Sequence, residues 1–232
     1  TYHKIQIKTL SLSSMEKNLT LYGDYASPPV RFVMITASLL KIELNFHDVD
    51  LFKSENKSEF YTKINPLQKV PALTVGNDTI CDSHAIALYL CQKSGDQELY
   101  PIDDLVQKGH VDQMLYFNAT TLFPIDSEIY WDYFSGIWPP VESKVENWYK
   151  ALNYLEERLK KHEYLVSDKM LLCDLCCVQT VMSMEIILPL PEKYQRIMEW
   201  RKAMENLPCS DINKRGLDRF SKFLKNVGSN LN

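Results

Sequence analysis

The sequence predicts a small α/β unit followed by an all-helical unit. Over residues 19–94, strand-like and helix-like segments follow one another in the order β-α-β-α-β-β-α, which is typical of a small mixed sheet with helices on its faces. From Pro101 onward the periodic segments are helical, and none of them reads convincingly as a strand. The polar, turn-like stretch at 95–101 separates the two patterns, so we expect a domain boundary there.

The composition is that of an ordinary globular protein. The chain has 232 residues, of which 45% are hydrophobic and 24% are charged. We expect one domain over residues 18–96 and a second, all-helical domain over residues 103–232. Residues 1–17 carry no strong periodicity and are predicted to be a flexible extension, either sequence upstream of a natural start at Met15 or a poorly ordered terminal arm.

Local signals define the elements of the first unit. Ser27 is the expected N-cap of a helix, and Pro28 suits its first turn because the N–H that proline lacks would be unpaired there. Two β-rich runs around residues 77–78 predict a hairpin, and Asp82 with Ser83 predicts the start of the next helix. The other expected elements are strands at 19–22 and 42–49 and a short helix at 54–64.

The second unit is expected to contain helices joined by loops. The predicted helices are at 104–123, 140–161, 172–188, 191–206 and 213–226. A loop after the first of them is expected to carry a cluster of aromatic residues, namely Tyr130, Trp131, Tyr133, Phe134 and Trp138.

Charge and hydropathy exclude several classes of function. The formal net charge of −4 gives no basic footprint for a nucleic-acid partner. The longest uncharged stretch, residues 113–125, is shorter than the ~20 residues that a membrane-spanning helix needs. The six cysteines are interpreted as free thiols, which predicts a cytoplasmic location. Cys173, Cys176 and Cys177 lie within one predicted helix without a partner pair of Cys or His nearby, so we expect core packing there and no metal site.

Three short motifs, in this order and spacing, resemble those of the cytosolic glutathione S-transferases, and most closely those of the insect delta and epsilon classes. They are Ser-Pro-Pro-Val-Arg at 27–31, Asn-Pro-Leu-Gln-Lys-Val-Pro-Ala-Leu at 65–73 and Asp-Ser-His-Ala-Ile at 82–86, and the similarity covers about residues 18–226. The resemblance implies a thioredoxin-like N-terminal domain, a C-terminal helical-bundle domain and glutathione as co-substrate without a metal. It also implies a homodimer in which the small domain of one subunit packs against the helices of the other.

Ser27 lies where these classes keep a catalytic serine. The resemblance implies that its hydroxyl stabilises the thiolate of glutathione. A free thiol titrates near ~8.5, and lowering that pKa by about two units requires roughly 2.7 kcal/mol of preferential anion stabilisation. A hydroxyl donor at a helix N-terminus is a plausible source, because the N–H groups and the dipole there also favour negative charge. The alternative is that Ser27 only caps its helix.

The same resemblance assigns a set of glutathione-binding residues. Pro71 after Val70 matches a cis-proline that turns the preceding backbone outward to pair with the cysteinyl backbone of glutathione. Asp82 matches a counter-charge for the γ-glutamyl amine, and Ser83 matches a donor to the γ-glutamyl carboxylate. His84 follows them, either as a further donor or as an ordinary solvated surface residue.

The chain departs from the family pattern at the glycine end of glutathione. Gln68 and Asn56 stand where the family has histidines. Both amides can hydrogen-bond, but neither can carry a positive charge, and Lys69 offers a compensating charge.

The helical unit is expected to form the pocket for the second substrate. A pocket lined by aromatic residues suits large, flat, apolar electrophiles or steroid-like ligands. The alternative for most of these rings is ordinary core packing, with about three touching the ligand. The candidate residues are Tyr116, Phe117, Asn118, Thr120, Phe123, Tyr130 and Phe134.

One further motif has an expected role in folding. Leu171 stands where the family has a capping threonine, and Asp174 follows at the matching acidic position. Losing such a cap costs about 1 kcal/mol. We expect Asp174 to recover part of this by facing the free backbone N–H groups.

These patterns lead to one main functional hypothesis and two alternatives. The hypothesis is a glutathione transferase that conjugates glutathione to hydrophobic electrophiles in detoxification. The first alternative is a non-catalytic carrier of hydrophobic ligands, favoured by the missing histidines and the aromatic segment. The second is a transferase dedicated to an endogenous steroid-like substrate, ranked lower because an acidic side chain would be expected near Asn118.

Overall fold

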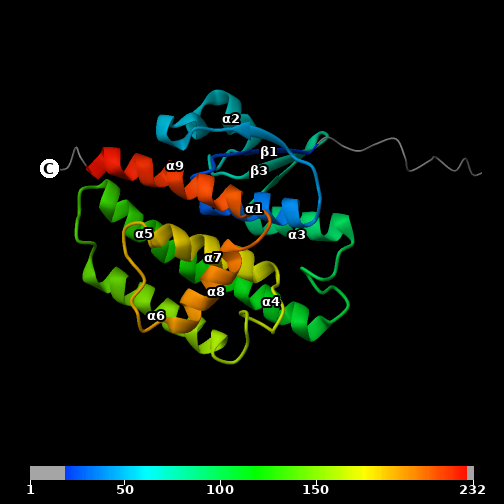
Figure 1. Cartoon of the computed structure of the whole chain (residues 1–232). Helices are drawn as coiled ribbons and strands as arrows, with labels where there is room; N and C mark the ends of the chain where they lie inside the picture. The colour runs from blue at the N-terminus through cyan, green and yellow to red at the C-terminus, as the bar shows by residue number, and fades with distance from the viewer. Residues whose placement is uncertain (1–18, 229–232) are drawn as a thin grey trace, which may run out of the picture.

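The computed structural model describes residues 19–228, so the predicted extension at 1–17 lies outside the described residues. The described part has a small sheet at one end and a bundle of helices at the other (Figure 1). Between them lie α1 (Pro28–Leu39), α3 (Ser83–Ser94) and α9 (Ser210–Gly228). Within it, we find no helix that is both long and apolar enough to cross a membrane.

The sheet contains four strands in the order β2-β1-β3-β4. β2 runs parallel to β1, whereas β3 is antiparallel to both β1 and β4, so the predicted mixed sheet is confirmed. The apolar side chains of Leu21 and Leu73 meet Val30 and Ile86 from the helices on one face, and Tyr61 covers the other face. The elements of this unit are β1 (Leu19–Gly23), α1 (Pro28–Leu39), β2 (Asn45–Asp48), α2 (Glu59–Ile64), β3 (Ala72–Val75), β4 (Asp78–Cys81) and α3 (Ser83–Ser94).

The predicted helix at 54–64 is only partly correct. Ser54 has a left-handed backbone with φ of 60°, which interrupts any helix that would begin there. Two 3₁₀ turns, at Leu51–Lys53 and Glu55–Lys57, precede α2 instead. The cap of α2 is Ser58, whose hydroxyl accepts the Tyr61 N–H at 3.2 Å.

The helical unit differs from the prediction at its first connection. Most of the segment that we expected to be an aromatic loop is the helix α5 (Phe123–Phe134), so Tyr130, Trp131, Tyr133 and Phe134 are helical, whereas Trp138 lies in the loop that follows. Pro124 is the second residue of α5 and comes shortly after a π-helical turn, in which the backbone has left the α-helical hydrogen-bond pattern. The elements are α4 (Leu105–Phe117), the π turn η3 (Asn118–Leu122), α5 (Phe123–Phe134), α6 (Glu142–Leu159), α7 (Leu172–Met184), α8 (Gln195–Glu205) and α9 (Ser210–Gly228).

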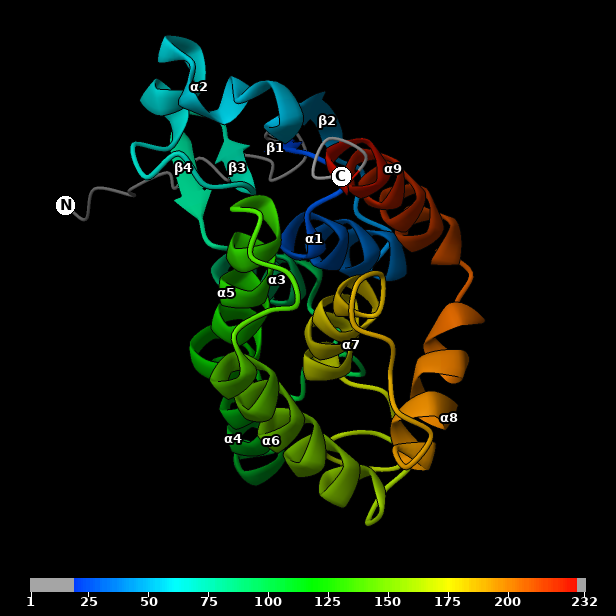
Figure 2. The same cartoon turned by 90° about the vertical axis from the view of Figure 1, so that its left-hand side faces the viewer.

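Helix α7 forms the centre of this unit and is buried along its whole length (Figure 2). Cys173, Cys176 and Cys177 lie in the core, as predicted. In the part of the chain that the structure describes, we find no group of three or more His, Cys, Asp or Glu side chains placed to hold a metal ion.

Asp174 has the folding role that the sequence predicted. One carboxylate oxygen accepts the Leu171 N–H at 2.9 Å, and the other accepts the Leu165 N–H at 2.9 Å and the Trp200 Nε1–H at 3.0 Å. Burial raises the pKa of Asp174 to about 6 despite these donors.

Candidate active site

A cavity of about 400 Å³ lies where the α/β unit meets the helical unit. Its walls come from the start of α1, the loop before β3, the start of α3, the π turn and α7. The lining residues are Pro28, Pro29, Phe32, Asn65, Leu67, Lys69, Val70, Pro71, Cys81, Asp82, Ser83, His84, Asn118, Ala119, Phe123, Cys176 and Thr180.

Ser27 lies at the N-cap position of α1, directly before the two prolines of the cavity wall. Its side chain makes no capping hydrogen bond, which differs from the expected cap. The backbone of the turn is held instead by Asp24, whose carbonyl accepts the Ser27 N–H at 3.0 Å and whose carboxylate accepts the Ala26 N–H at 2.9 Å. The Ser27 hydroxyl is therefore not used to hold the helix end.

The Val70–Pro71 peptide bond is cis, as the resemblance implied. Lys69, Val70 and Pro71 all line the cavity. The carbonyl of Lys69 accepts hydrogen bonds from Tyr61 Oη and Asn65 Nδ2, both at 2.7 Å. These bonds fix the backbone that leads into the cis bond.

The start of α3 brings Asp82, Ser83 and His84 to the opposite wall of the cavity. Asp82 caps the helix and accepts the His84 N–H at 2.8 Å and the Ala85 N–H at 3.3 Å. Nδ1 of His84 lies 3.4 Å from the Asp82 carboxylate. This approach lacks hydrogen-bond alignment, so it is an electrostatic contact. The His84 contact is the main cause that lowers the pKa of Asp82.

A polar chain connects α3 with the helical unit through Asn118. Nε2 of His84 lies 3.1 Å from Oδ1 of Asn118, and Nδ2 of Asn118 donates to Oγ1 of Thr180 at 3.0 Å. Asn118 is buried, with only 4% of its surface exposed, so these contacts satisfy its amide.

Sequence reasoning missed Thr180 and Cys176, which line the cavity from α7. Their spacing of four places both on one face of α7, but gives no sign that this face meets the cavity.

Two expected glycine-end residues do not reach the cavity wall. Nε2 of Gln68 donates to Oγ1 of Thr62 at 3.2 Å, and Nδ2 of Asn56 donates to the carbonyl of Gln68 at 2.8 Å. Both amides thus stabilise the loop before the cis-proline. Lys69 is the predicted glycine-end residue that does line the cavity.

Of the residues expected to bind the second substrate, Asn118 and Phe123 line this cavity. The structure does not bring the others to it. Phe117 packs against Tyr154 in the core, and Tyr130 is buried, with its hydroxyl donating to the carbonyl of Ser183. Tyr116 and Phe134 are exposed to solvent, Tyr116 by 70%. The hydroxyl of Thr120 donates to the backbone carbonyl of Tyr116.

Comparison with known proteins decides the family. Residues 21–98 match the family described as glutathione S-transferase, N-terminal domain, and residues 124–208 match glutathione S-transferase, C-terminal domain. The chain belongs to the glutathione S-transferase family. Membership confirms the predicted family and enzyme class, a transferase, so a non-catalytic carrier is not needed to explain the chain.

The relatives are insect proteins. Glutathione S-transferase 1 of Manduca sexta is 34% identical over 198 residues, which cover 82% of this chain and 88% of that protein. A glutathione transferase homologue from Drosophila mojavensis, solved with bound glutathione, is 32% identical with a TM-score of 0.84 over 90% of this chain and 97% of its own. An epsilon-class glutathione S-transferase from the housefly, Musca domestica, is 31% identical with the same TM-score, and the match covers 90% of this chain and 98% of that protein. The thioredoxin-like and helical domains are therefore those of the family.

Proposed function

We propose that this glutathione S-transferase binds glutathione in the cavity between its two domains and conjugates the sulfur to a hydrophobic electrophile. The observation that carries the proposal is the convergence of the α1 N-terminus, the cis Val70–Pro71 bond and the Asp82–Ser83 helix start around one cavity. A role in detoxification follows from the same chemistry, since conjugation to a charged peptide makes an apolar electrophile more soluble in water.

Ser27 is the proposed catalytic residue. Its hydroxyl is not used to cap α1, so it can donate to the sulfur of glutathione. The sulfur would lie at the start of α1, where the helix dipole and the free N–H groups add to the stabilisation of negative charge.

Two other walls bind the peptide part of glutathione. The backbone of Val70, which lines the cavity beside Pro71, pairs with the cysteinyl backbone of glutathione. Asp82 pairs with the γ-glutamyl amine, and Ser83 donates to the γ-glutamyl carboxylate at the start of α3. Lys69 provides positive charge for the glycine carboxylate, which is the reason that neutral Gln68 and Asn56 are tolerated.

The second substrate is an apolar electrophile. Phe32 and Phe123 line the cavity with apolar rings, and Asn118 supplies the polar group at its base. This composition favours a hydrophobic molecule over a charged one.

Conjugation of a generic aryl halide by purified protein tests the proposal. The native enzyme should be retained on immobilised glutathione and should turn over the halide. Ser27→Ala should still be retained but should lose at least about tenfold in kcat, since one hydrogen bond to a charged group contributes roughly 1.5–3 kcal/mol. Equal turnover by the two proteins would contradict the role of Ser27.

We further propose that the protein is a homodimer located in the cytoplasm. Large apolar side chains are exposed on both domains, namely Phe60 and Leu67 on the small one and Leu105, Val106 and Tyr116 on α4. Exposed apolar residues on two faces are typical of a surface that a second subunit covers. The cysteines of the chain are free thiols, which fits a reducing compartment.

A further inference from the structure

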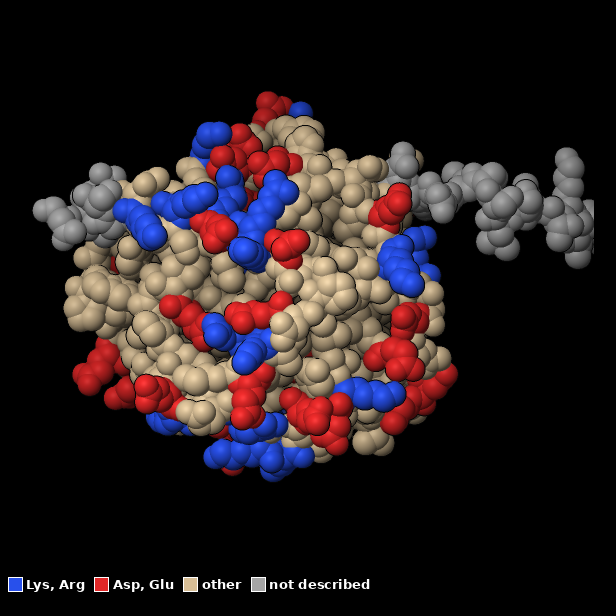
Figure 3. All heavy atoms as spheres, in the orientation of Figure 1, with Lys and Arg blue, Asp and Glu red and all other residues tan. Residues whose placement is uncertain are grey.

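The backbone directly before Ser27 is held by the C-terminal helix α9. This helix runs beside α1, as both views of the fold show (Figures 1 and 2). Basic side chains gather over it on the face shown in Figure 3, including Lys214, Arg215, Arg219 and Lys222. Two of them contact the segment 24–26.

Asp24 is the centre of these contacts. Its carboxylate is fully buried and accepts a forked pair of hydrogen bonds from Arg219, with Nε at 2.6 Å from Oδ1 and the second nitrogen at 2.9 Å from Oδ2. The same two oxygens accept the N–H groups of Ala26 and Leu51 at 2.9 and 3.0 Å. Because Asp24 also accepts the Ser27 N–H through its carbonyl, the position of Ser27 depends on Asp24.

Arg219 is itself held in place by its surroundings. Its guanidinium lies 5.1 Å from the centre of the Phe52 ring and 3.3 Å from the carboxylate of Asp50. The Phe52 ring stacks on Phe223 of the same helix at 3.7 Å. The bonds to Asp24 raise the pKa of Arg219 further, so the guanidinium stays charged.

Gly216, one turn before Arg219, allows the close approach of α9. A Cβ atom at this position would lie 2.2 Å from the carbonyl oxygen of Tyr25 and 2.3 Å from Cδ of Arg31. Arg31 is fully buried and donates to the carbonyls of Tyr25 and Ala26 at 3.0 and 2.7 Å. Arg215 covers the Tyr25 ring, with its guanidinium carbon 4.0 Å from the ring centre.

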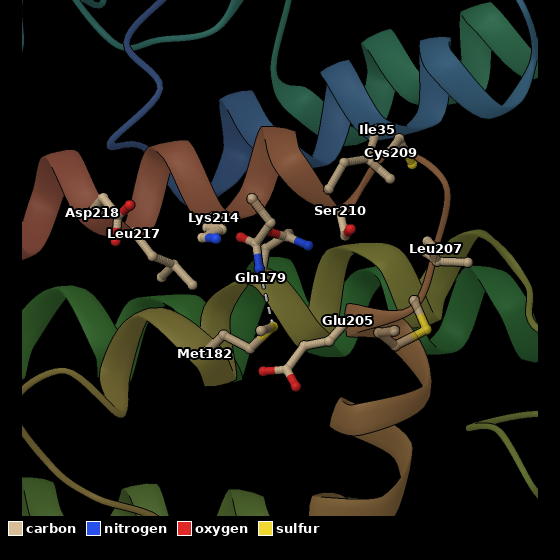
Figure 4. A pocket seen from close by; sticks show the side chains of 12 residues that line it. Ile35, Gln179, Met182, Glu205, Leu207, Cys209, Ser210, Lys214, Leu217 and Asp218 are labelled. Atoms are coloured by element: carbon tan, nitrogen blue, oxygen red, sulfur yellow. Dashed lines mark hydrogen bonds between the residues drawn. The ribbon is translucent and has the colours of Figure 1, made fainter.

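On its other side α9 is less closely packed. A cavity of about 280 Å³ lies there. Figure 4 shows Leu217 on α9 and Met182 on α7 among its walls. Asn213 bridges this space with a hydrogen bond to the sulfur of Met182. The polar contacts with residues 24–26, together with the hydrogen bond from Arg31 Nε to Oδ1 of Asn213 at 2.9 Å, attach this part of α9 to the start of α1.

We propose that Arg219 is a positioning residue for the transferase reaction, acting through Asp24 on the Ser27 hydroxyl. The Arg219 guanidinium is directed at the carboxylates of Asp24 and Asp50, and the residue does not line the glutathione cavity, so we assign it no contact with either substrate. Its effect is geometric, since a displaced Asp24 would move the hydroxyl relative to the glutathione sulfur. The inference rests on the proposed role of Ser27.

Arg219→Lys is the informative variant, because it keeps the charge that Asp24 needs and removes the forked geometry. We expect kcat to fall about tenfold, within the loss of up to roughly 10²-fold that a 1 Å misplacement can cause. The pKa of the bound glutathione thiol should rise by about one unit, since less anion stabilisation remains. KM for glutathione should change less than about twofold, because the α3 and Val70 walls are untouched.

The matched control is Lys222→Gln, which removes one positive charge from an exposed position on the same helix. It should leave kcat, KM and the thiol pKa unchanged. Gly216→Ala provides a second variant without any change of charge, and it should reproduce the loss of kcat and the raised thiol pKa. Circular dichroism and thermal melting show whether each variant is folded.

Ser27→Ala, measured in parallel, separates the two possible failures. If it raises the thiol pKa while folded Arg219→Lys and Gly216→Ala match Lys222→Gln, the inference is wrong and the proposed function stands. If Ser27→Ala leaves the thiol pKa unchanged, the proposed role of Ser27 fails, and the positioning role of Arg219 fails with it.

Discussion

At the scale of single residues, polar side chains from different elements hydrogen-bond to one another at the wall of the cavity. His84, Asn118 and Thr180 come from three separate elements and form one hydrogen-bonded chain. The sequence identified His84 and Asn118 because motif and polarity set them apart. It missed Thr180 because a threonine within an apolar helix looks like any buried hydroxyl, and its partner is 62 residues away.

Asn118→Ala should destabilise the protein and weaken glutathione binding together. The change leaves Nε2 of His84 without its partner, while Thr180 keeps its hydrogen bond to the carbonyl of Cys176, and an unsatisfied buried polar group costs about 1–3 kcal/mol. Urea unfolding should show this loss, and KM for glutathione should rise because His84 is no longer fixed beside Asp82. Asn147→Ala, an exposed change on α6, is the control, and an equal effect of both variants would contradict this account.

At the scale of elements, the sequence predicts the order and type of the helices and strands better than the residues at which they begin and end. The order of strands and helices along the first unit, the hairpin and the start of α3 follow from local turn and cap signals, and the structure confirms them. The sequence predicts a loop after residue 123, whereas the structure has helix α5 at Phe123–Phe134, in which Pro124 is tolerated because it lies in the first turn. The π turn that precedes α5 arises from tertiary packing, which a local pattern does not reveal.

Asp174 gives α7 a pH-dependent stability. Burial raises the pKa of Asp174 from its ordinary value of 3.8 to about 6. Between pH 4 and pH 6 the carboxyl is therefore protonated in the folded protein, whereas it is ionised in the unfolded chain. Its contribution to the free energy of unfolding therefore falls as the pH rises through this window, by up to about 3 kcal/mol.

Asp174→Asn isolates this effect. The variant should be less stable at every pH, because an amide oxygen cannot accept from all three of the donors that Asp174 binds. The difference in the free energy of unfolding between native and variant protein should be larger at pH 4 than at pH 7. A difference that does not change with pH would contradict the raised pKa.

At the scale of the whole molecule, the function depends on the two domains meeting. The glutathione-binding signals lie in the N-terminal domain, where the sequence motifs could be recognised. The proposed walls for the second substrate come from α1, the π turn and α5 together, so which residues line them depends on how the two domains pack. This is why Phe123 lines the cavity while Tyr130, another aromatic residue seven positions later, is part of the core.

The proposed homodimer makes a prediction at this scale. Tyr116→Glu places a charge on the exposed apolar face of α4, and burying that charge against a second subunit is costly. Light scattering should show a dimer for the native protein and a shift toward monomer for the variant. Lys150→Glu, on the exposed surface of α6, should leave the dimer intact. A native monomer at micromolar concentration would contradict the proposal.

The pKa of the glutathione thiol in the bound state tests the central claim most directly. It can be followed through the absorbance of the thiolate as the pH of the enzyme–glutathione complex is varied. The account predicts a value about two units below the ~8.5 of a free thiol, and a return toward that value in Ser27→Ala. A bound thiol that titrates like free glutathione in the native enzyme would contradict it.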